Sequence, residues 1–242
     1  MLGLSSACAQ PTSSRPTVAD NSGESFVTPG GKQVVVHPLV HASIRMEFDG
    51  KQIYIDPVTN LNGRTFDFAK MPKADIVIIT HEHHDHFDKN AVNALSTANT
   101  CLIATKKCAA EYGAGISLAN GDSVIVADNL SIKAVAAYNT TAGHLRFHPK
   151  GIGNGYILNF DGLRVYVAGD TEVIPEMSEF GKINVAFLPC NQPYTMTPDQ
   201  LVEAAKILKP TVLYPYHFSD TDLSGIPARL QPLGIDVRIL SF

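Results

Sequence analysis

A run of potential metal ligands, Thr-His-Glu-His-His-Asp-His-Phe-Asp at positions 80–88, is the strongest chemical feature of this sequence. It holds four of the nine histidines within six positions. His81 and His83 lie two residues apart, so on an extended segment their imidazoles project to the same side and can share one cation. Asp85 and His86 are adjacent, so they diverge and can serve a second position. Because zinc accepts imidazole nitrogens and carboxylate oxygens, the run predicts a metal site.

The place of this run in the chain favours a metal site over a plainer interpretation. Histidine-rich runs also occur as exposed loops or tag-like tails. Here the run directly follows residues 75–80, Asp-Ile-Val-Ile-Ile-Thr, an apolar stretch typical of a central strand that is covered on both faces. Strand-end loops are where such proteins place functional residues. The four uncharged imidazoles and two carboxylates of residues 81–86, beside a buried strand, would be unfavourable without a cation.

Short apolar or alternating segments between Gly, Asp and Asn turns predict many strands and few helices. Strands are predicted at 34–40, 43–48, 52–56, 75–80, 101–104, 123–126, 130–136, 156–160, 163–168, 183–188, 211–214 and 236–240. Helices are predicted at 89–97 with Asp88 as N-cap, 106–112, 198–208 with Thr197 as N-cap, and 228–233. A loop is expected from 139 to 155. No internal repeat is present, so two sheets covered by outer helices fit best, in one domain over residues 32–242.

Composition excludes several classes of protein. Of the 242 residues, 45% are hydrophobic and 17% charged, which suits a chain with a real core rather than a disordered one. No apolar stretch reaches the roughly 18 residues that a membrane-spanning helix needs. The net charge of -4 disfavours a nucleic-acid partner, so a small molecule is the expected substrate. The sequence leaves the oligomeric state open.

The first 31 residues are expected to lie outside the domain. Ala7-Cys8-Ala9 fits the small-x-small pattern of a signal-peptidase site, although a basic start and a full apolar region are missing. We read residues 1–31 as a signal-peptide remnant and a flexible leader, which favours a periplasmic or secreted protein. The alternative is a ragged terminus of a cytoplasmic protein.

Three further cysteines, Cys101, Cys108 and Cys190, leave the compartment open. Cys101 and Cys108 could pair in an exported protein, but free thiols are the simpler expectation for all three. The absence of a Cys-x-x-C motif argues against a thiolate zinc site.

The pattern His-x-His-x-Asp-His resembles the signature of metallo-β-lactamase-fold hydrolases. Further matches to that superfamily follow in order, each at the end of a predicted strand: His41-Ala42-Ser43, Tyr54-Ile-Asp-Pro57, Ala168-Gly-Asp-Thr171 and Tyr216-His217. From about residue 34 onward the chain looks like the small ascorbate-6-phosphate-lactonase-like and phosphodiesterase-like members. The resemblance implies an α+β fold, the αββα four-layer sandwich with two mixed sheets face to face.

The resemblance also implies a ligand set. His81 and His83 would hold one metal, and Asp85, His86 and His217 a second, with Asp170 bridging the two. Asp85 is also the residue expected to be essential for catalysis. Two zinc ions, with manganese or iron as alternatives, would share a hydroxide that attacks the substrate. Taken alone, Asp170 could be a turn carboxylate and His217 a packed core histidine.

The sequence departs from the family where a third histidine usually follows a strand, because Ala137-Tyr138-Asn139 has none. Asn139 is a poor zinc ligand. His144 and His148 are the nearby alternatives, and we prefer His148, which stands before Pro149 in a glycine-rich segment. If neither reaches the first position, the site would hold one metal. His148, Lys150, Tyr194 and Asn139 are also candidates for substrate contacts.

Two residues could support the ligands. Asp56 could orient a metal-binding imidazole; the alternative is a turn residue before Pro57. His41 could approach the site or be packed in a strand end.

Tyr194 and Thr195 lie in a loop that could line the pocket or pack as a turn.

The resulting expectation is a metal-dependent hydrolase of a lactone, ester or phosphodiester. An iron-dependent oxidoreductase is an alternative, weakened because flavodiiron relatives carry Glu where this chain has His83. The third alternative is a non-catalytic binding protein on the same scaffold.

Overall fold

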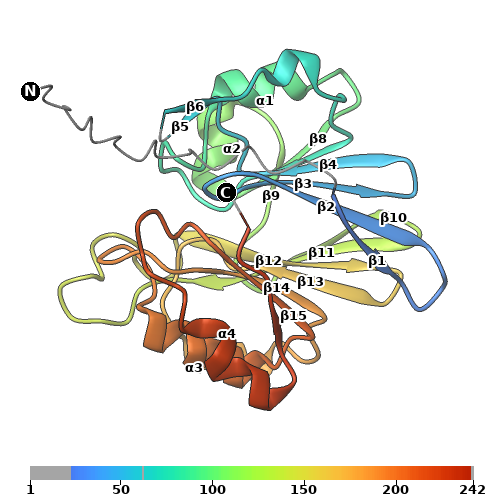
Figure 1. Cartoon of the computed structure of the whole chain (residues 1–242). Coiled ribbons are helices and arrows are strands. Elements are labelled where there is room, and N and C mark those ends of the chain that lie inside the picture. Colours follow the sequence, from blue (N-terminus) through green and yellow to red (C-terminus); the bar gives the residue numbers. More distant parts are fainter. Residues whose placement is uncertain (1–22, 62, 241–242) are drawn as a thin grey trace, which may run out of the picture.

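Two seven-stranded β-sheets lie face to face in the computed structural model, which describes residues 23–61 and 63–240. Helices α1 (Lys89–Leu95) and α2 (Lys106–Tyr112) cover one outer face, and α3 (Pro198–Leu208) and α4 (Ile226–Leu230) cover the other (Figure 1). The predicted αββα sandwich is therefore confirmed. In the described part of the chain no helix is long and apolar enough to cross a membrane.

The first sheet is mixed, with strand order β1-β2-β3-β4-β7-β8-β9. Its first four strands pair antiparallel, and the strands from β4 onward pair parallel. Asp49-Gly50 forms the tight turn between β3 and β4, as its turn chemistry predicted. The strands are β1 (Glu24–Val27), β2 (Gln33–Val40), β3 (Ser43–Phe48), β4 (Lys51–Ile55), β7 (Ile76–Ile78), β8 (Cys101–Ala104) and β9 (Ile116–Ser117).

The second sheet repeats this plan, with order β10-β11-β12-β13-β14-β15-β16. It is antiparallel up to β13 and parallel beyond. Its strands are β10 (Ser123–Ala127), β11 (Leu130–Ala137), β12 (Gly153–Phe160), β13 (Leu163–Val167), β14 (Val185–Pro189), β15 (Val212–Tyr216) and β16 (Asp236–Val237). Small elements complete the fold: β5 (Asn60–Leu61), β6 (Arg64–Thr65), and the 3-10 helices η1 (Phe68–Lys70), η2 (Pro175–Glu179) and η3 (Gln231–Leu233).

Three apolar layers hold the sandwich together. Alternate strand residues such as Ile44, Ile55 and Phe187 fill the space between the sheets. Residues on the opposite strand faces pack against the helices, for example Ala186 in the layer that contains Leu201 of α3. A third layer lies under α1 and α2. Helix α3 begins as predicted, because the Thr197 side chain accepts from the Gln200 N–H and the Gln200 side chain caps the Thr197 N–H.

The N-terminal boundary of the domain differs from the prediction. Strand β1 falls inside the stretch expected to be a flexible leader, and it pairs with β2. Phe26 packs edge-on against Tyr214 with 6.4 Å between ring centroids, and Glu24 contacts Tyr214 and Arg238. The leader prediction is thus wrong for residues 24–27. Residues 1–22, including the proposed cleavage site, lie outside the described residues.

The three described cysteines are free, as expected: Cys108 and Cys190 are buried, and Cys101 is half-buried.

Gly169 is required where β13 turns toward the site. Its φ is +64°, and an added Cβ would lie 2.8 Å from the Asn154 carbonyl oxygen and 3.1 Å from the Thr80 Cβ. Gly50, in the β3–β4 turn, has a φ of +76° but open space around it. Both glycines therefore adopt a positive φ, but only at Gly169 would an added Cβ be crowded by neighbouring atoms.

We predict that Gly169→Ala lowers the free energy of unfolding by about 3 kcal/mol, against about 1 kcal/mol for Gly50→Ala. Urea unfolding of both variants measures the difference. Equal losses would contradict the claim that the backbone is crowded at Gly169.

Candidate metal centre

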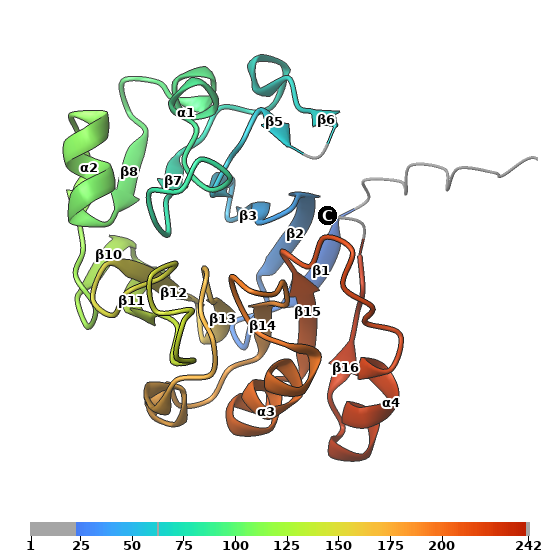
Figure 2. The same cartoon turned by 90° about the vertical axis from the view of Figure 1, so that its left-hand side faces the viewer.

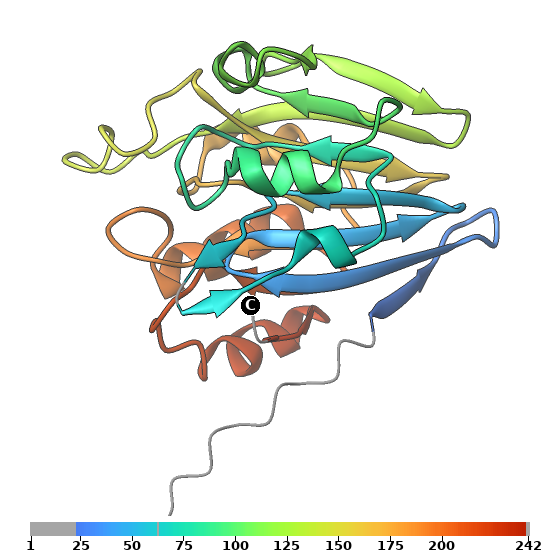
Figure 3. The same cartoon turned by 90° about the horizontal axis from the view of Figure 1, so that it is seen from above.

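Six strands that run in the same direction deliver the site residues to one end of the sandwich (Figure 2). In the first sheet β2, β4 and β7 are mutually parallel, and in the second β11, β13 and β15 are. The residues that follow these strands are His41, Asp56, the 80–88 run, the 139–152 loop, Asp170 and His217. The 139–152 loop extends beyond the sheets at this end (Figure 3).

The first cluster consists of His81, His83, His148 and Asp170, whose ligand atoms all lie within 4.8 Å of one another. His83 Nδ1 is 3.1 Å from His81 Nε2 and 3.3 Å from His148 Nε2. His148 Nε2 is 3.1 Å from Asp170 Oδ2. Residues 137–139 lack the third histidine that is usual in the family. His148 joins this cluster instead.

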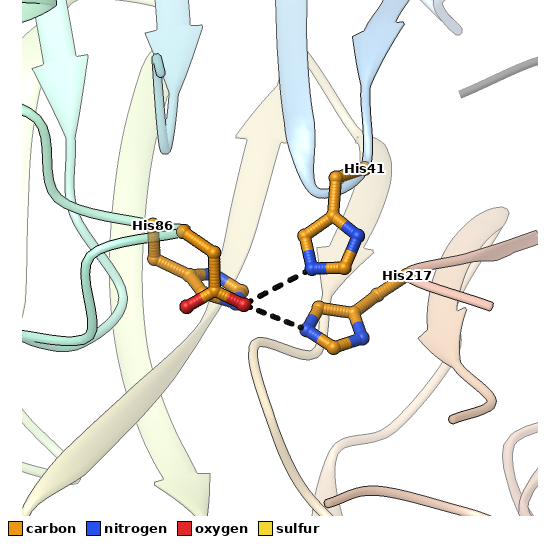
Figure 4. A group of neighbouring side chains, drawn as sticks. His41, His86 and His217 are labelled. Atoms are coloured by element: carbon orange, nitrogen blue, oxygen red, sulfur yellow. Dashed lines mark hydrogen bonds and ion pairs between the residues drawn. The ribbon is translucent and has the colours of Figure 1, made fainter. Parts of the chain in front are cut away.

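The second cluster consists of His41, Asp85, His86 and His217. Asp85 Oδ2 lies 3.1 Å from His41 Nε2 and 3.5 Å from His217 Nε2, the contacts dashed in Figure 4. His86 Nε2 lies 3.9 Å from the same oxygen, so three imidazoles approach this carboxylate. His41, whose role the sequence left open, lies here with its ring centroid 3.7 Å from that of His217.

Asp170 connects the clusters. Its Oδ2 lies 3.1 Å from His148 Nε2 and 3.3 Å from His217 Nε2, and its Oδ1 lies 3.2 Å from His86 Nε2. One carboxylate thus faces imidazoles of both groups, which is the arrangement a bridging ligand requires.

Outer hydrogen bonds set which nitrogen of His86 and of His81 faces the centre. The buried Asp56 carboxylate accepts from the Thr80 N–H at 2.8 Å, from the Thr80 hydroxyl at 2.6 Å, and from His86 Nδ1 at 2.8 Å. Because the Thr80 hydroxyl gives its proton to Asp56, its oxygen accepts from His81 Nδ1 at 3.0 Å. His86 and His81 therefore each present Nε2 to the clusters, as metal-binding histidines with such partners do.

His148 is oriented in the same way from the other sheet. Its Nδ1 lies 3.0 Å from the Tyr194 carbonyl oxygen, which accepts the proton and leaves Nε2 facing His83. Asn139 supports this contact, because its Nδ2 donates to the same Tyr194 oxygen at 2.8 Å and its N–H donates to the His148 carbonyl.

Several ligand atoms lack a hydrogen-bond partner, which indicates that this donor set fits divalent cations. Among the described residues, His86 Nε2, His217 Nε2 and Asp170 Oδ1 are buried without a hydrogen-bond partner. Buried polar atoms of folded proteins are nearly always paired. Here they lie within 3.2 to 3.3 Å of opposing ligand atoms, so a cation is the partner that would satisfy them.

The carboxylates of the site are ionised. Burial opposes a charge on Asp170, but His217 and His86 hold the pKa of that carboxyl well below its usual range. Burial likewise opposes a charge on Asp85, yet the nearby His217 imidazole and the hydrogen bond from His41 lower its pKa. Burial also works against protonation of His217, whereas Asp170 and Asp85 raise the pKa of this imidazole to about 9. Without a cation, protonated imidazole therefore balances the charge of these carboxylates, and a bound cation would take the place of those protons.

The backbone at the site is strained. His41, Asp56 and His217 have φ values of +58°, +46° and +49°, in the left-handed region that non-glycine residues seldom occupy. The His217 N–H donates to the His41 carbonyl oxygen at 3.0 Å, which joins two of these turns. Such strain clusters at functional sites.

Comparisons with known proteins agree with this geometry. Residues 36–217 match the sequence model of the β-lactamase superfamily domain. A UPF0173 metal-dependent hydrolase of Ligilactobacillus salivarius is 30% identical over 184 residues, which cover 74% of this chain and 82% of that protein. The chain belongs to the metal-dependent hydrolases of the β-lactamase superfamily.

Two solved structures of hydrolases are similar over most of their length. One, from Parabacteroides distasonis ATCC 8503 and provisionally described as a metal-dependent hydrolase, is 46% identical with a TM-score of 0.86, covering 90% of this chain and 97% of its own. The metallo hydrolase Igni18 of Ignicoccus hospitalis is 29% identical with a TM-score of 0.74, covering 86% and 95%. A diiron β-hydroxylase of Streptomyces venezuelae, 15% identical with a TM-score of 0.69, shares the fold alone.

The structure brings together all seven residues that the sequence singled out as ligands, and adds His41. The ligands predicted from the sequence are His81, His83, Asp85, His86, His148, Asp170 and His217. His41 carried a signal, since it follows strand β2 directly as the other ligands follow theirs.

Other predicted residues lie elsewhere. His144 pairs with Glu172 at 3.1 Å, away from both clusters. Lys150 pairs with Glu176 at 2.7 Å. Asn139 is buried, and its side chain donates a hydrogen bond to the Tyr194 carbonyl of another loop. The Tyr194 ring packs against Phe147 with 5.0 Å between centroids. Thr195 is buried and forms turn contacts with Asn191.

Asp56→Asn tests the outer support of the ligands. We predict a 10- to 100-fold loss of affinity for Zn²⁺ or Mn²⁺, because the amide cannot accept from both Thr80 and His86 as the carboxylate does. Competition with a chromophoric chelator gives the affinity. Asp161→Asn is a matched control, because Asp161 also has a positive φ, of +48°, but lies in the β12–β13 turn. Equal affinities in the two variants would contradict the role of Asp56.

Proposed function

We propose that this protein hydrolyses a small ester, lactone or phosphodiester at a pair of divalent cations held by the two clusters. The observation that carries the proposal is Asp170, whose carboxylate faces His148 of the first cluster and His86 and His217 of the second. Zinc is our preferred metal, because six imidazoles and two carboxylates are ligands it accepts. Manganese and iron are alternatives that metal analysis distinguishes.

When bound, such cations supply Lewis-acid chemistry, lowering the pKa of water and polarising a carbonyl or phosphoryl oxygen. The chain's own contribution is to hold and orient. We propose that Asp85 accepts a hydrogen bond from the attacking water, because its side chain is 23% exposed and its carboxyl stays ionised. The same low pKa makes Asp85 a weak base, so its role is orientation rather than storage of a proton.

The substrate reaches the clusters through a hollow beside the first one. Its walls include His81, His83, His148 and Asp170. We propose that the scissile bond lies over these residues, with the remainder of the substrate against the 147–153 segment.

Asp85→Asn is predicted to abolish turnover while keeping the fold. The neutral amide removes one anionic ligand and the water contact, so we expect kcat to fall at least 1000-fold on a panel of lactones, aryl esters and phosphodiesters. The wild-type protein reconstituted with Zn²⁺, Mn²⁺ or Fe²⁺ is the reference, and chelator treatment should remove its activity. Circular dichroism and urea unfolding report the fold.

Wild-type protein that binds metal but is inert toward the whole panel would contradict the proposed function. Full activity of Asp85→Asn would contradict the role assigned to that carboxylate.

A further inference from the structure

A buried glutamate that belongs to neither cluster holds the loop that carries His148. The Glu172 side chain is completely buried. Its Oε2 accepts from the N–H groups of Thr140 and Thr141 at 2.8 and 2.6 Å and from the Thr140 hydroxyl at 3.0 Å. Its Oε1 accepts from His144 Nδ1 at 3.1 Å. Four donors of the 139–152 loop therefore converge on one carboxylate.

The loop depends on such hydrogen bonds because it has little else to hold it. Residues 138–152, all of which the structure describes, form neither helix nor strand between β11 and β12. From Thr141 to Ile152 only His148 is buried, and the loop extends beyond the sheets (Figure 3). A segment with few buried contacts opens at low cost in free energy. The ligand His148 is thus carried by a segment whose position must be fixed from outside.

Glu172 lies on the same short segment as the bridging ligand Asp170. Between them, the Thr171 hydroxyl accepts from the Tyr138 N–H at 3.1 Å, and the Glu172 N–H donates to the Tyr138 carbonyl at 3.1 Å. The start of the loop is therefore fixed relative to Asp170, whose Oδ2 lies 3.1 Å from His148 Nε2.

The anchored part of the loop is joined directly to His148. The Asn139 N–H donates to the His148 carbonyl at 2.9 Å, and Asn139 Nδ2 donates to the His144 carbonyl at 3.2 Å. Glu172 binds the residues on either side of these contacts. A displacement of the 140–144 stretch would consequently displace His148 from the first cluster.

We infer that Glu172 is a positioning residue, which holds the 139–152 loop so that His148 lies in the first cluster before a cation binds. Its loss should weaken the first cation and spare the second, whose other ligands lie outside this loop: His41, Asp85, His86 and His217. The inference rests on the two-cation centre of the proposed function. It also assigns a role to His144, as a donor to the anchor.

Zn²⁺ titration of the metal-free full chain, in competition with a chromophoric chelator, tests the inference. In Glu172→Ala we expect the Kd of one of the two cations to rise at least tenfold, as when the loop occupies its binding position in about one molecule in ten. Glu172→Gln should stay within about threefold of the wild type, because its amide oxygen can accept from Thr140 and Thr141 while its N–H donates to the other tautomer of His144.

Glu47→Ala is the matched control. Glu47 also accepts from several side chains, with His37 Nε2 at 2.7 Å and Gln52 Nε2 at 3.1 Å, but it lies on β3 and belongs to neither cluster. Both Zn²⁺ affinities should remain those of the wild type.

A ligand-deleted background assigns the weakened cation to a cluster. His81→Ala with His83→Ala removes two ligands of the first cluster and leaves the second to bind Zn²⁺. Adding Glu172→Ala there should change the remaining affinity by less than about twofold, as expected of independent sites. Equal weakening of both cations in the single variant would indicate a merely structural role and overturn the inference.

Hydrogen exchange of the metal-free protein tests the anchor without cation or substrate. In the wild type we expect the Thr140 and Thr141 amides to be protected, and in Glu172→Ala we expect exchange across residues 139–152 to be at least tenfold faster, with the strands unchanged. Wild-type exchange of these amides as fast as in an unfolded peptide would overturn the inference, as would a loss of affinity in Glu172→Gln equal to that in Glu172→Ala.

If Glu172→Ala does not fold, His144→Ala replaces it, because this side chain is 25% exposed and supplies one of the four donors. We then expect a loss of about threefold for the same cation, the effect of one hydrogen bond, and no loss would overturn the inference. Wild-type protein that binds two Zn²⁺ ions but turns over no substrate would contradict the proposed hydrolysis and leave the role of Glu172 intact.

Discussion

The buried Asp170 carboxylate between two groups of imidazoles is the interaction on which the site depends. It lies at the end of β13, within 3.3 Å of nitrogens from His86, His148 and His217. Those nitrogens come from both sheets and from three separate loops, so no local segment could create the arrangement by itself. The packing of the two sheets makes this arrangement possible. Each sheet contributes a set of parallel strands, and both sets end at the same edge of the sandwich.

Ligand positions are then refined by contacts that do not touch the centre. Asp56 and Thr80 fix the rings of His86 and His81, and the Tyr194 carbonyl fixes His148. The long loop that carries His148 is held at its base by Glu172, whose buried carboxylate accepts from the N–H groups of Thr140 and Thr141 at 2.8 and 2.6 Å. A loop tethered in this way can supply a ligand as reliably as a strand end can, since little freedom remains to be lost when a ligand binds.

The sequence was informative where local chemistry decides the structure. Asp49-Gly50 and Asp161-Gly162 lie at hairpin turns, Thr197 caps α3, and the apolar 75–80 stretch contains the central strand β7. Strand β1 escaped prediction because it is only four residues long and presents Ser25 and Val27 to solvent, so its pattern is weak. Its register depends on Phe26 and Glu24 reaching residues near the other end of the chain.

In the candidate site, too, local features could be predicted from the sequence and contacts between distant segments could not. The spacing within residues 80–88 was sufficient to indicate a metal site, since those residues meet locally. The place of His148 depends on the 139–152 loop folding back, through the Asn139 N–H bond to the His148 carbonyl at 2.9 Å, and spacing alone cannot show this. His41 could not be assigned because a lone histidine at a strand end is as often packed as liganding. Its approach to Asp85 depends on a left-handed turn that only the structure reveals.

The most direct test of a two-cation centre is anomalous diffraction from crystals of the protein loaded with zinc, recorded on both sides of the zinc absorption edge. We predict two anomalous peaks, one within coordination distance of His81, His83 and His148 and the other of His41, Asp85, His86 and His217, with Asp170 contacting both. A single peak, or peaks away from these side chains, would contradict the account.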